Sequence, residues 1–347
     1  LVYKGDLVRN FSGGIKRKGA YLGNLDITAE MDFGKTMGLR GTKVFLYGLG
    51  NHGDTPSEFI GDSFVTSNIE APATFKLYEA YLQLALDDRS AVVIGLRDLN
   101  ADYYVTESSG NLINSAFGVS KVIAQTGMNG PSIFPTTSLS INFKYESPTS
   151  FYFQTSAFNA LAGDPESKYG THINDSTKEG HLLIWEAGSA SQAENERVYK
   201  YSLGSWLYSN LVDSIDSSKP QSQSYGFYFL MDHPISENIS FFIKHGLASQ
   251  KVNSFSEGTE TGFTFKGILS KRNGDILAIG LIRGKTSEDY RVLNNSQSIE
   301  TVVEAAYTIK VRQEIELTPD YQWIIHPGLD KSIKNAQVAG LRFRIEI

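Results

Sequence analysis

Polar and apolar residues alternate without a break along the segment 21–33, YLGNLDITAEMDF. The odd positions carry apolar side chains or glycine, and the even positions from Asn24 to Asp32 carry polar ones. Such alternation predicts a β-strand with one apolar and one polar face. A soluble sheet buries its apolar face, whereas a membrane barrel turns that face to lipid and its polar face to a watery lumen.

Strand-like runs recur along the whole chain, and no long capped helical pattern lies between them. The pattern therefore predicts an all-β protein of sixteen strands. These runs cover 2–12, 21–33, 42–51, 74–86, 90–98, 137–146, 150–158, 181–188, 198–207, 224–232, 239–251, 262–270, 275–283, 299–311, 314–326 and 337–347.

Short and long connections alternate between these runs. The short ones include DDRS (87–90), ESPTS (146–150), DHPISEN (232–238), KRNG (271–274) and RQ (312–313), while 34–41 and 189–197 are long for this class. The long ones are 52–73, 99–136, 159–180, 208–223, 252–261, 284–298 and 327–336. This asymmetry is typical of an up-and-down antiparallel transmembrane β-barrel, with short turns on one side and long loops on the other. We expect one barrel domain over 1–347, with both termini on the short-turn side.

Composition narrows the class further. With 20 Phe, 18 Tyr and 32 Gly, the chain suits an all-β protein, and no run approaches the roughly 18 apolar residues of a membrane helix. The absence of Cys excludes disulfide scaffolds and thiolate metal sites, and the net charge of −6 argues against a nucleic-acid partner. Because the chain starts at Leu1 without a visible signal peptide, we expect a processed or trimmed protein.

Several stretches, in order, resemble the carbohydrate-selective porin family (OprB-type) of Gram-negative outer membranes. They are GDLVRNFSGGIKRKGAYLGNLDITAEMDF (5–33), VFLYGLGNHGD (44–54), SNIEA (67–71), KLYEAYLQ (76–83), IGLRDLNADYYVTESSGNLINSAFGVS (94–120), GPSIFPTTSLSINFKY (130–145) and ETVVEAAYTIKVRQEIELTPDYQWIIHPG (300–328). The chain is shorter than most members and ends in Ile347 rather than an aromatic residue. The resemblance implies a sixteen-stranded outer-membrane barrel that conducts small sugars passively, glucose above all, with an inward-folded loop narrowing the pore. It implies no cofactor and no metal.

A sugar channel needs hydrogen-bonding groups dense enough to replace water around the hydroxyls, and aromatic surfaces for the ring faces. The strand pattern places suitable side chains on the lumen face. The alternative for each of these side chains is that it only contacts water in a wide lumen. The run 74–86 is expected to turn Glu79 inward and Tyr78 outward. The candidates on the strands are Asp26, Glu30, Glu79, Tyr81, Glu304, Arg342 and Arg344.

The long segment 99–136 is the candidate constriction, because LINSAFG within it is too apolar for a freely solvated loop. Its pore-facing candidates are Tyr103, Tyr104, Glu107, Asn114 and Phe117. Arg97 leads into it and is expected to face the lumen, with Asp98 pointing away. Glu70, in the preceding long loop, is either a pore residue or a structural latch.

The sequence also bears on functions other than a sugar channel. A general diffusion porin and a soluble all-β sugar-binding protein remain alternatives. The six His show no metal-binding spacing, and no G-x-S-x-G motif occurs, so no enzyme is expected. Lys16, Arg17 and Lys18 form either a solvated surface or a contact for the phosphates of lipopolysaccharide. The expected partners are therefore sugars, outer-membrane lipid and lipopolysaccharide, and the barrel is a homotrimer or a monomer.

Overall fold

Sixteen antiparallel strands close into a barrel in which each strand pairs with its sequence neighbours and β1 pairs with β16. The computed structural model describes residues 1–39, 41–163, 171–191, 199–268 and 272–347. The strands are β1 (Val2–Gly14), β2 (Gly19–Asp32), β3 (Thr42–Gly53), β4 (Thr74–Ala85), β5 (Ser90–Arg97), β6 (Ser138–Glu146), β7 (Phe151–Asn159), β8 (His181–Ala190), β9 (Lys200–Val212), β10 (Ser222–Pro234), β11 (Ile239–Ala248), β12 (Phe255–Lys266), β13 (Ile276–Thr286), β14 (Ile299–Arg312), β15 (Ile315–Ile325) and β16 (Lys334–Glu346).

Short helices occupy the connections. They are α1 (Phe33–Met37), α2 (Ser57–Ile60), η1 (Leu99–Ala101), η2 (Ser108–Asn111), η3 (Ser115–Phe117), α3 (Lys121–Ala124), α4 (Glu288–Leu293) and η4 (Pro327–Leu329). No helix in the described part of the chain is long and apolar enough to cross a membrane.

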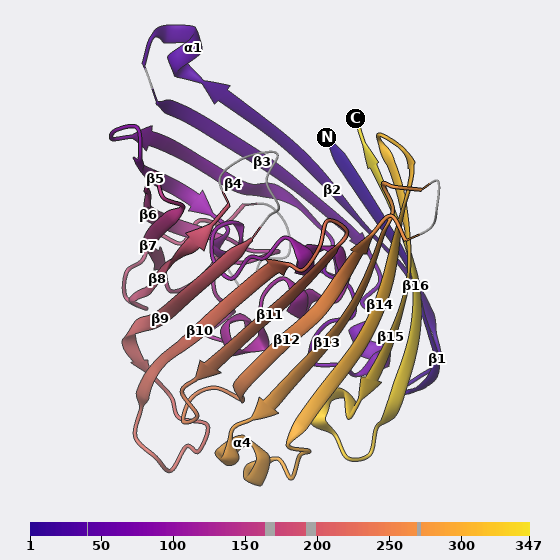
Figure 1. The fold of residues 1–347 in the computed structure, drawn as a ribbon. Helices are drawn as coiled ribbons and strands as arrows, with labels where there is room; N and C mark the ends of the chain where they lie inside the picture. The colour runs from indigo at the N-terminus through magenta and orange to yellow at the C-terminus, as the bar shows by residue number, and fades with distance from the viewer. Residues whose placement is uncertain (40, 164–170, 192–198, 269–271) are drawn as a thin grey trace.

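The predicted asymmetry of the connections is confirmed. Both termini and α1 lie at one end of the barrel, and α4 lies at the other (Figure 1). The short-turn end holds connections such as 86–89 and 313–314, whereas the opposite end holds 54–73, 98–137 and 287–298. The turns KRNG and 189–197 lie partly outside the described residues.

The outer surface of the barrel is apolar, as the inverted alternation predicts. Soluble proteins rarely expose an apolar surface of this extent, so the face suits lipid rather than water. This observation argues against the soluble sugar-binding alternative. The exposed side chains include Leu7, Ile27, Leu46, Phe75, Ile94, Ile141, Trp185, Leu203, Phe227, Phe263, Ile279, Tyr321, Trp323 and Leu341.

Two departures from the predicted strands have physical reasons. β12 begins at Phe255, so most of the predicted loop 252–261 is strand. Its first half is polar on both faces. Glu257 and Thr259 lie on the same face, where alternation would require apolar residues, so the strand pattern is hidden. In β4, Glu79 pairs with Tyr47 and Leu77 with Gly48, which leaves Tyr78 as the extra residue of a β-bulge. The bulge turns Tyr78 inward as well as Glu79, so the predicted outward position of Tyr78 is wrong.

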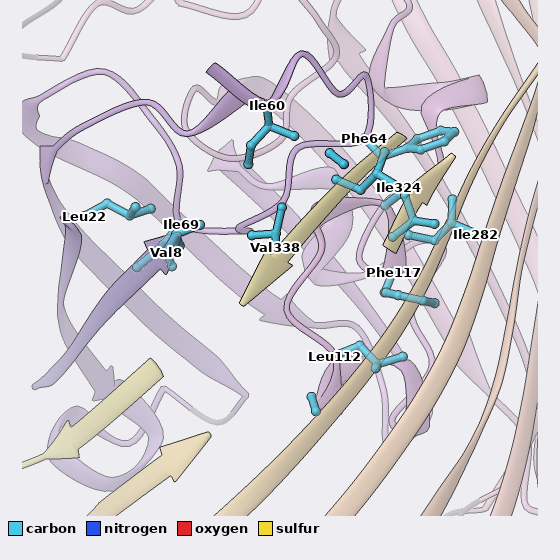
Figure 2. Close-up of a cluster of buried hydrophobic side chains, with 14 of the residues drawn as sticks. Val8, Leu22, Ile60, Phe64, Ile69, Leu112, Phe117, Ile282, Ile324 and Val338 are labelled. Carbon is cyan, nitrogen blue, oxygen red and sulfur yellow. The ribbon is translucent and has the colours of Figure 1, made fainter. Parts of the chain in front are cut away.

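The interior of the barrel is not an open tube, because two long connections fold into it. Segments 54–73 and 98–137 pack apolar side chains against lumen-facing residues of the wall. Figure 2 shows one such cluster, in which Phe64, Leu112 and Phe117 from the connections meet Ile282 and Ile324 from β13 and β15. These lumen-facing apolar residues lie where the connections dock.

Candidate functional site

The inward segment 98–137 starts from a charged cluster at the end of β5. Arg97 donates to Asp102 through Nε and Nη2 (3.0 and 2.9 Å) and to Glu79 through Nη1 (3.3 Å). Its guanidinium carbon lies 4.4 Å from the ring centre of Tyr81. Lys144 also pairs with Asp102. Burial opposes ionisation of Asp102, but Lys144 and Arg97 outweigh it and hold the pKa of this carboxyl below its usual range.

The structure thus brings together three predicted residues, Glu79, Tyr81 and Arg97. Asp98 also lies in this cluster, which corrects the expectation that it points away. It follows the last strand residue, so strand parity no longer applies, and its carboxylate accepts hydrogen bonds from the Tyr78 hydroxyl (2.6 Å) and the Asn100 amide (2.7 Å). Burial raises the pKa of Asp98 to about 7.

The middle of the segment is fastened by Lys244 of β11. Its buried ammonium donates to the backbone oxygens of Tyr104 (3.3 Å), Phe117 (2.5 Å) and Gly118 (2.9 Å). The same ammonium lies 4.7 Å from the centre of the Tyr104 ring, and the Tyr104 hydroxyl donates to Glu260 (2.8 Å). One wall lysine therefore holds two distant points of the segment.

Further wall groups bind the backbone near Tyr103 and Tyr104. Glu186 of β8 accepts the Tyr104 amide (3.3 Å), and the Tyr103 hydroxyl contacts Ser156 of β7 (2.5 Å). Asp232 of β10 accepts both the amide and the hydroxyl of Ser108 (2.8 and 2.6 Å). The segment is thus anchored to several neighbouring strands on this side of the barrel.

The segment reaches the opposite wall at Asn114. Glu304 of β14 accepts the amides of Ile113 (2.5 Å) and Asn114 (3.0 Å), and the Asn114 side chain donates to Gln322 of β15 (3.0 Å). Because the segment starts at β5 and binds β14 and β15, it crosses the whole interior.

Segment 54–73 joins this partition near the barrel seam. The Asn68 amide donates to the oxygen of Ile113 (2.9 Å), and the Ser115 amide donates to the oxygen of Val65 (3.0 Å). The Ser67 hydroxyl donates to Asp6 (2.7 Å), which also receives two hydrogen bonds from Arg342. The two inward segments therefore form one connected layer.

Five predicted pore residues are buried instead of facing open space: four belong to the inward segment, and Glu304 belongs to the wall strand β14 that contacts it. The expected exposure of these side chains is not what the structure shows, because their rings, amide and carboxylate are used in fastening the segment to the wall. A passing solute does not reach them in this arrangement. They are Tyr103, Tyr104, Asn114, Phe117 and Glu304, all at most 1% exposed.

A cavity of about 630 Å³ adjoins the inward layer. Glu316 and Arg344 line it near the short-turn end, and Gly110 and Ile113 of the inward segment line it as well. Its wall also includes Lys4, Asn24, Tyr47, Asn68, Asp98, Asn100, Asn111, Phe134, Thr308, Lys310, Thr318 and Arg342.

Several charges around this cavity occur as close opposite pairs. Lys4 lies 3.0 Å from Asp26, and Arg344 lies 3.7 Å from Glu316. Asp26 also accepts the hydroxyl of Tyr47 (2.6 Å). Paired charges offer strong hydrogen bonds while cancelling much of their distant field. Among the described residues, no group of three His, Cys, Asp or Glu side chains is placed to hold a metal ion.

Three remaining predicted residues lie apart from the cavity lining. Glu30 is exposed and pairs with Lys43 (3.0 Å) on β3. Glu70 accepts the amide and hydroxyl of Ser57 (3.2 Å each), so it acts as a latch within its own segment. Burial, reinforced by the neighbouring charge of Asp62, raises the pKa of Glu70 to about 7. Glu107 is exposed on the inward segment.

Several cavity residues were not among the predicted site residues. Lys4 and Tyr47 share the lumen parity of β1 and β3, so strand alternation alone would have found them. Asn111 and Phe134 belong to a segment without periodicity, and no sequence signal marks which of its residues reach the cavity.

Comparison with known proteins places this geometry in a family. The model of the carbohydrate-selective porin, OprB family, matches residues 16–347. Porin B of Pseudomonas aeruginosa is 21% identical over 393 aligned positions, covering 99% of this chain and 86% of that protein. Porin AaxA of Chlamydia pneumoniae is 29% identical over 150 residues, which span 43% of this chain and only 34% of AaxA.

Solved structures agree on the fold. The high-pH structure of Pseudomonas putida OprB superposes with a TM-score of 0.85 at 19% identity, covering 99% of this chain and 92% of that one. Its low-pH structure gives a TM-score of 0.63 at 16% identity, covering 99% and 90%. With the family model spanning nearly the whole chain, the protein is a member of the OprB family of carbohydrate-selective porins, channels of the bacterial outer membrane.

Proposed function

We propose that this porin conducts small neutral sugars of monosaccharide size, and that the cavity beside the inward layer is part of their path. The observation that supports this is the lining of the cavity, where amides, hydroxyls and paired charges converge on a space of about 630 Å³. This volume falls within the roughly 300–1,000 Å³ typical of small-molecule sites.

Two pairs and one arginine supply the hydrogen bonds that a sugar exchanges for water. Lys4 with Asp26 and Arg344 with Glu316 each offer donors and acceptors to hydroxyl groups, and Arg342, whose partner Asp6 is buried, lines the cavity as a donor. Because each pair is close to neutral, the wall attracts hydroxyls without strongly retaining an ion. Binding stays weak enough for release, which passive conduction requires.

Aromatic rings complete the proposed path. Tyr47 and Phe134 line the cavity and offer apolar surface to the face of a sugar ring. Of the predicted residues, Asp26, Arg342 and Arg344 are proposed to contact sugar. Glu79, Tyr81, Arg97, Tyr103, Tyr104, Asn114, Phe117 and Glu304 are proposed to hold the inward segment in place. No contact with sugar is proposed for Glu30, Glu70 or Glu107.

Liposome swelling tests the proposal. Reconstituted protein is compared for entry of glucose, a disaccharide and a zwitterionic amino acid of similar size to glucose. We expect glucose to enter faster than the amino acid, and Arg344→Gln to reduce this preference severalfold. Lys43→Gln, which removes a lysine of the Glu30 pair outside the cavity, is the matched control and should leave the preference unchanged.

A general diffusion porin is the alternative in the same class. It predicts entry rates ordered by solute size alone, and equal rates for glucose and the amino acid. Equal entry of glucose and the amino acid through the wild type, Arg344→Gln and Lys43→Gln would refute a sugar-tuned path. The protein would still be a channel.

The assembly state is a separate part of the proposal. The apolar outer face suits contact with lipid or with other copies of the barrel, so a monomer and a homotrimer are both compatible with it. Native mass spectrometry from detergent distinguishes them by mass.

A further inference from the structure

A second cavity, of about 370 Å³, lies on the outer wall of the barrel at its first two strands. Leu7 and Arg9 share the outward parity of β1, and both are exposed. Gly19, which has no side chain, and Tyr21 of β2 form the other side. The remaining lining residues are Val8, Ala20 and Asp54. The hollow therefore combines apolar surface with one cation, Arg9, and one anion, Asp54.

The basic turn 15–18 directly continues this wall at the long-loop end. Lys16, Arg17 and Lys18 are all exposed. The long-loop end of such a barrel faces the outside of the cell, so these cations lie at the level of the outer headgroups.

The turn is held in a fixed shape. The buried side chain of Asn10 donates to the oxygens of Gly13 (2.9 Å) and Lys16 (3.1 Å), and the Asn10 amide donates to the oxygen of Lys18 (3.0 Å). The Lys16 amide donates to the oxygen of Phe59 (2.8 Å). The three cations are thus presented by a rigid backbone rather than by a loose loop.

Most of this positive charge is uncompensated. Arg9, Lys16 and Arg17 have no ion-pair partner among the described residues, and Lys18 lies 3.8 Å from Asp54 with both side chains half-exposed. Lys334, exposed and paired in register with Gly14, adds a fifth cation. The exposed carboxylates of the adjoining connections are Asp54, Glu58 and Asp330, so the five cations still outnumber them.

We propose that this surface binds a phosphorylated glycolipid of the outer leaflet. An acyl chain lies in the hollow against Leu7 and Tyr21, while the phosphates contact Arg9 and the basic turn. Apolar contact in the membrane plane combined with cations at the headgroup level is how proteins recognise anionic lipids. Guanidinium groups suit phosphate because they donate two parallel hydrogen bonds. The site is on the outer wall, so its occupancy is independent of sugar passage.

The test uses the full-length barrel in detergent and native mass spectrometry with three probes. These are bisphosphorylated lipid A, the same lipid with both phosphates removed, and inorganic phosphate. The site variant is the combination R9Q, K16Q, R17Q and K18Q. The matched control is R283Q with K285Q, which removes two exposed outward cations of β13, separated from β1 by three strands. Heat-modifiable gel mobility and glucose entry into liposomes show that each variant is folded.

We expect the wild type and the control to retain bisphosphorylated lipid A about tenfold or more better than the dephosphorylated lipid, and the site variant to lose this difference. Three results would each overturn the proposal. The site variant could retain bisphosphorylated lipid A as well as the wild type does, the site variant and the control could lose it equally, or the wild type could retain the lipid equally with and without its phosphates. If inorganic phosphate alone displaces the lipid, the surface is a simple anion site and the acyl contact is refuted.

Discussion

Arg342 of the last strand and Asp6 of the first form a bidentate ion pair, with Nε and Nη2 each 2.7 Å from a carboxylate oxygen. Asp6 is buried, and it also accepts the hydroxyl of Ser67 from an inward segment (2.7 Å). This pair therefore joins the seam of the barrel to the layer inside it. The first prediction follows from its burial.

Arg342→Met should destabilise the barrel by about 3 kcal/mol, because Asp6 would remain buried and charged without its partner. Urea unfolding in liposomes measures the change. Arg344→Met is the control, since Arg344 is more exposed and its loss should change stability by about 1 kcal/mol or less. Equal effects of the two variants would contradict a special role for the seam pair.

Lys244→Met should loosen the inward segment while leaving the strands paired. The oxygens of Tyr104, Phe117 and Gly118 would lose their buried donor. Hydrogen exchange should quicken at amides 104–118 but not in β1 or β16, and the preference for glucose over the amino acid should fall. Unchanged hydrogen exchange at amides 104–118 would show that the other contacts with the wall are enough to hold the segment in place. Lys43→Met, which removes a lysine paired with Glu30 and not in contact with the inward segment, is the matched control.

Asp98 should make the ion preference of the channel depend on pH. Its pKa is raised to about 7 by burial, so the carboxyl is neutral below that pH and negative above it. Because the folded state binds this proton more tightly than the unfolded chain, the group's contribution to stability declines as the pH rises from about 4 to about 7. Reversal potentials in a salt gradient should show cation preference increasing between about pH 6 and about pH 8. Asp98→Asn should reduce that increase, and an unaltered increase would exclude Asp98.

Tyr78→Phe should move the midpoint of this transition to higher pH. The Tyr78 hydroxyl donates to Asp98 (2.6 Å) and thereby favours the ionised carboxylate. Loss of a hydrogen bond to a charged group corresponds to a shift of about one pH unit. Tyr47→Phe is the control, because that hydroxyl donates to Asp26 instead. A shift of the same size in both variants would contradict the assignment.

Strand alternation alone was sufficient for much of the wall. It placed Asp26, Glu79, Arg97, Arg342 and Arg344 on the inner face. Side chains alternate with a period of two, so the face of each strand residue is fixed once the apolar face is assigned to the lipid. It failed at Tyr78, where one bulge residue reverses the parity. It also failed at the start of β12, where both faces are polar.

The inward segment was harder to predict in detail. Its apolar composition indicated that it packs inside, but Tyr104 and Phe117 are buried by wall residues far away in sequence, such as Glu260 and Phe242. Such contacts depend on the path of the chain through the barrel, which no local pattern encodes. Exposure of a loop residue in the lumen is therefore a tertiary property, unlike the face of a strand residue.

Because of the apolar clusters inside the barrel, this membrane protein buries apolar side chains in two different environments. Leu203 on the outside is stabilised by whatever hydrocarbon surrounds it, and detergent can replace lipid there. Phe117 on the inside has no such substitute, since only the chain itself covers it. The interior therefore follows the rules of water-soluble cores, including weakening in the cold. A cooled sample in mild detergent should loosen from within while its outer shell of strands stays closed.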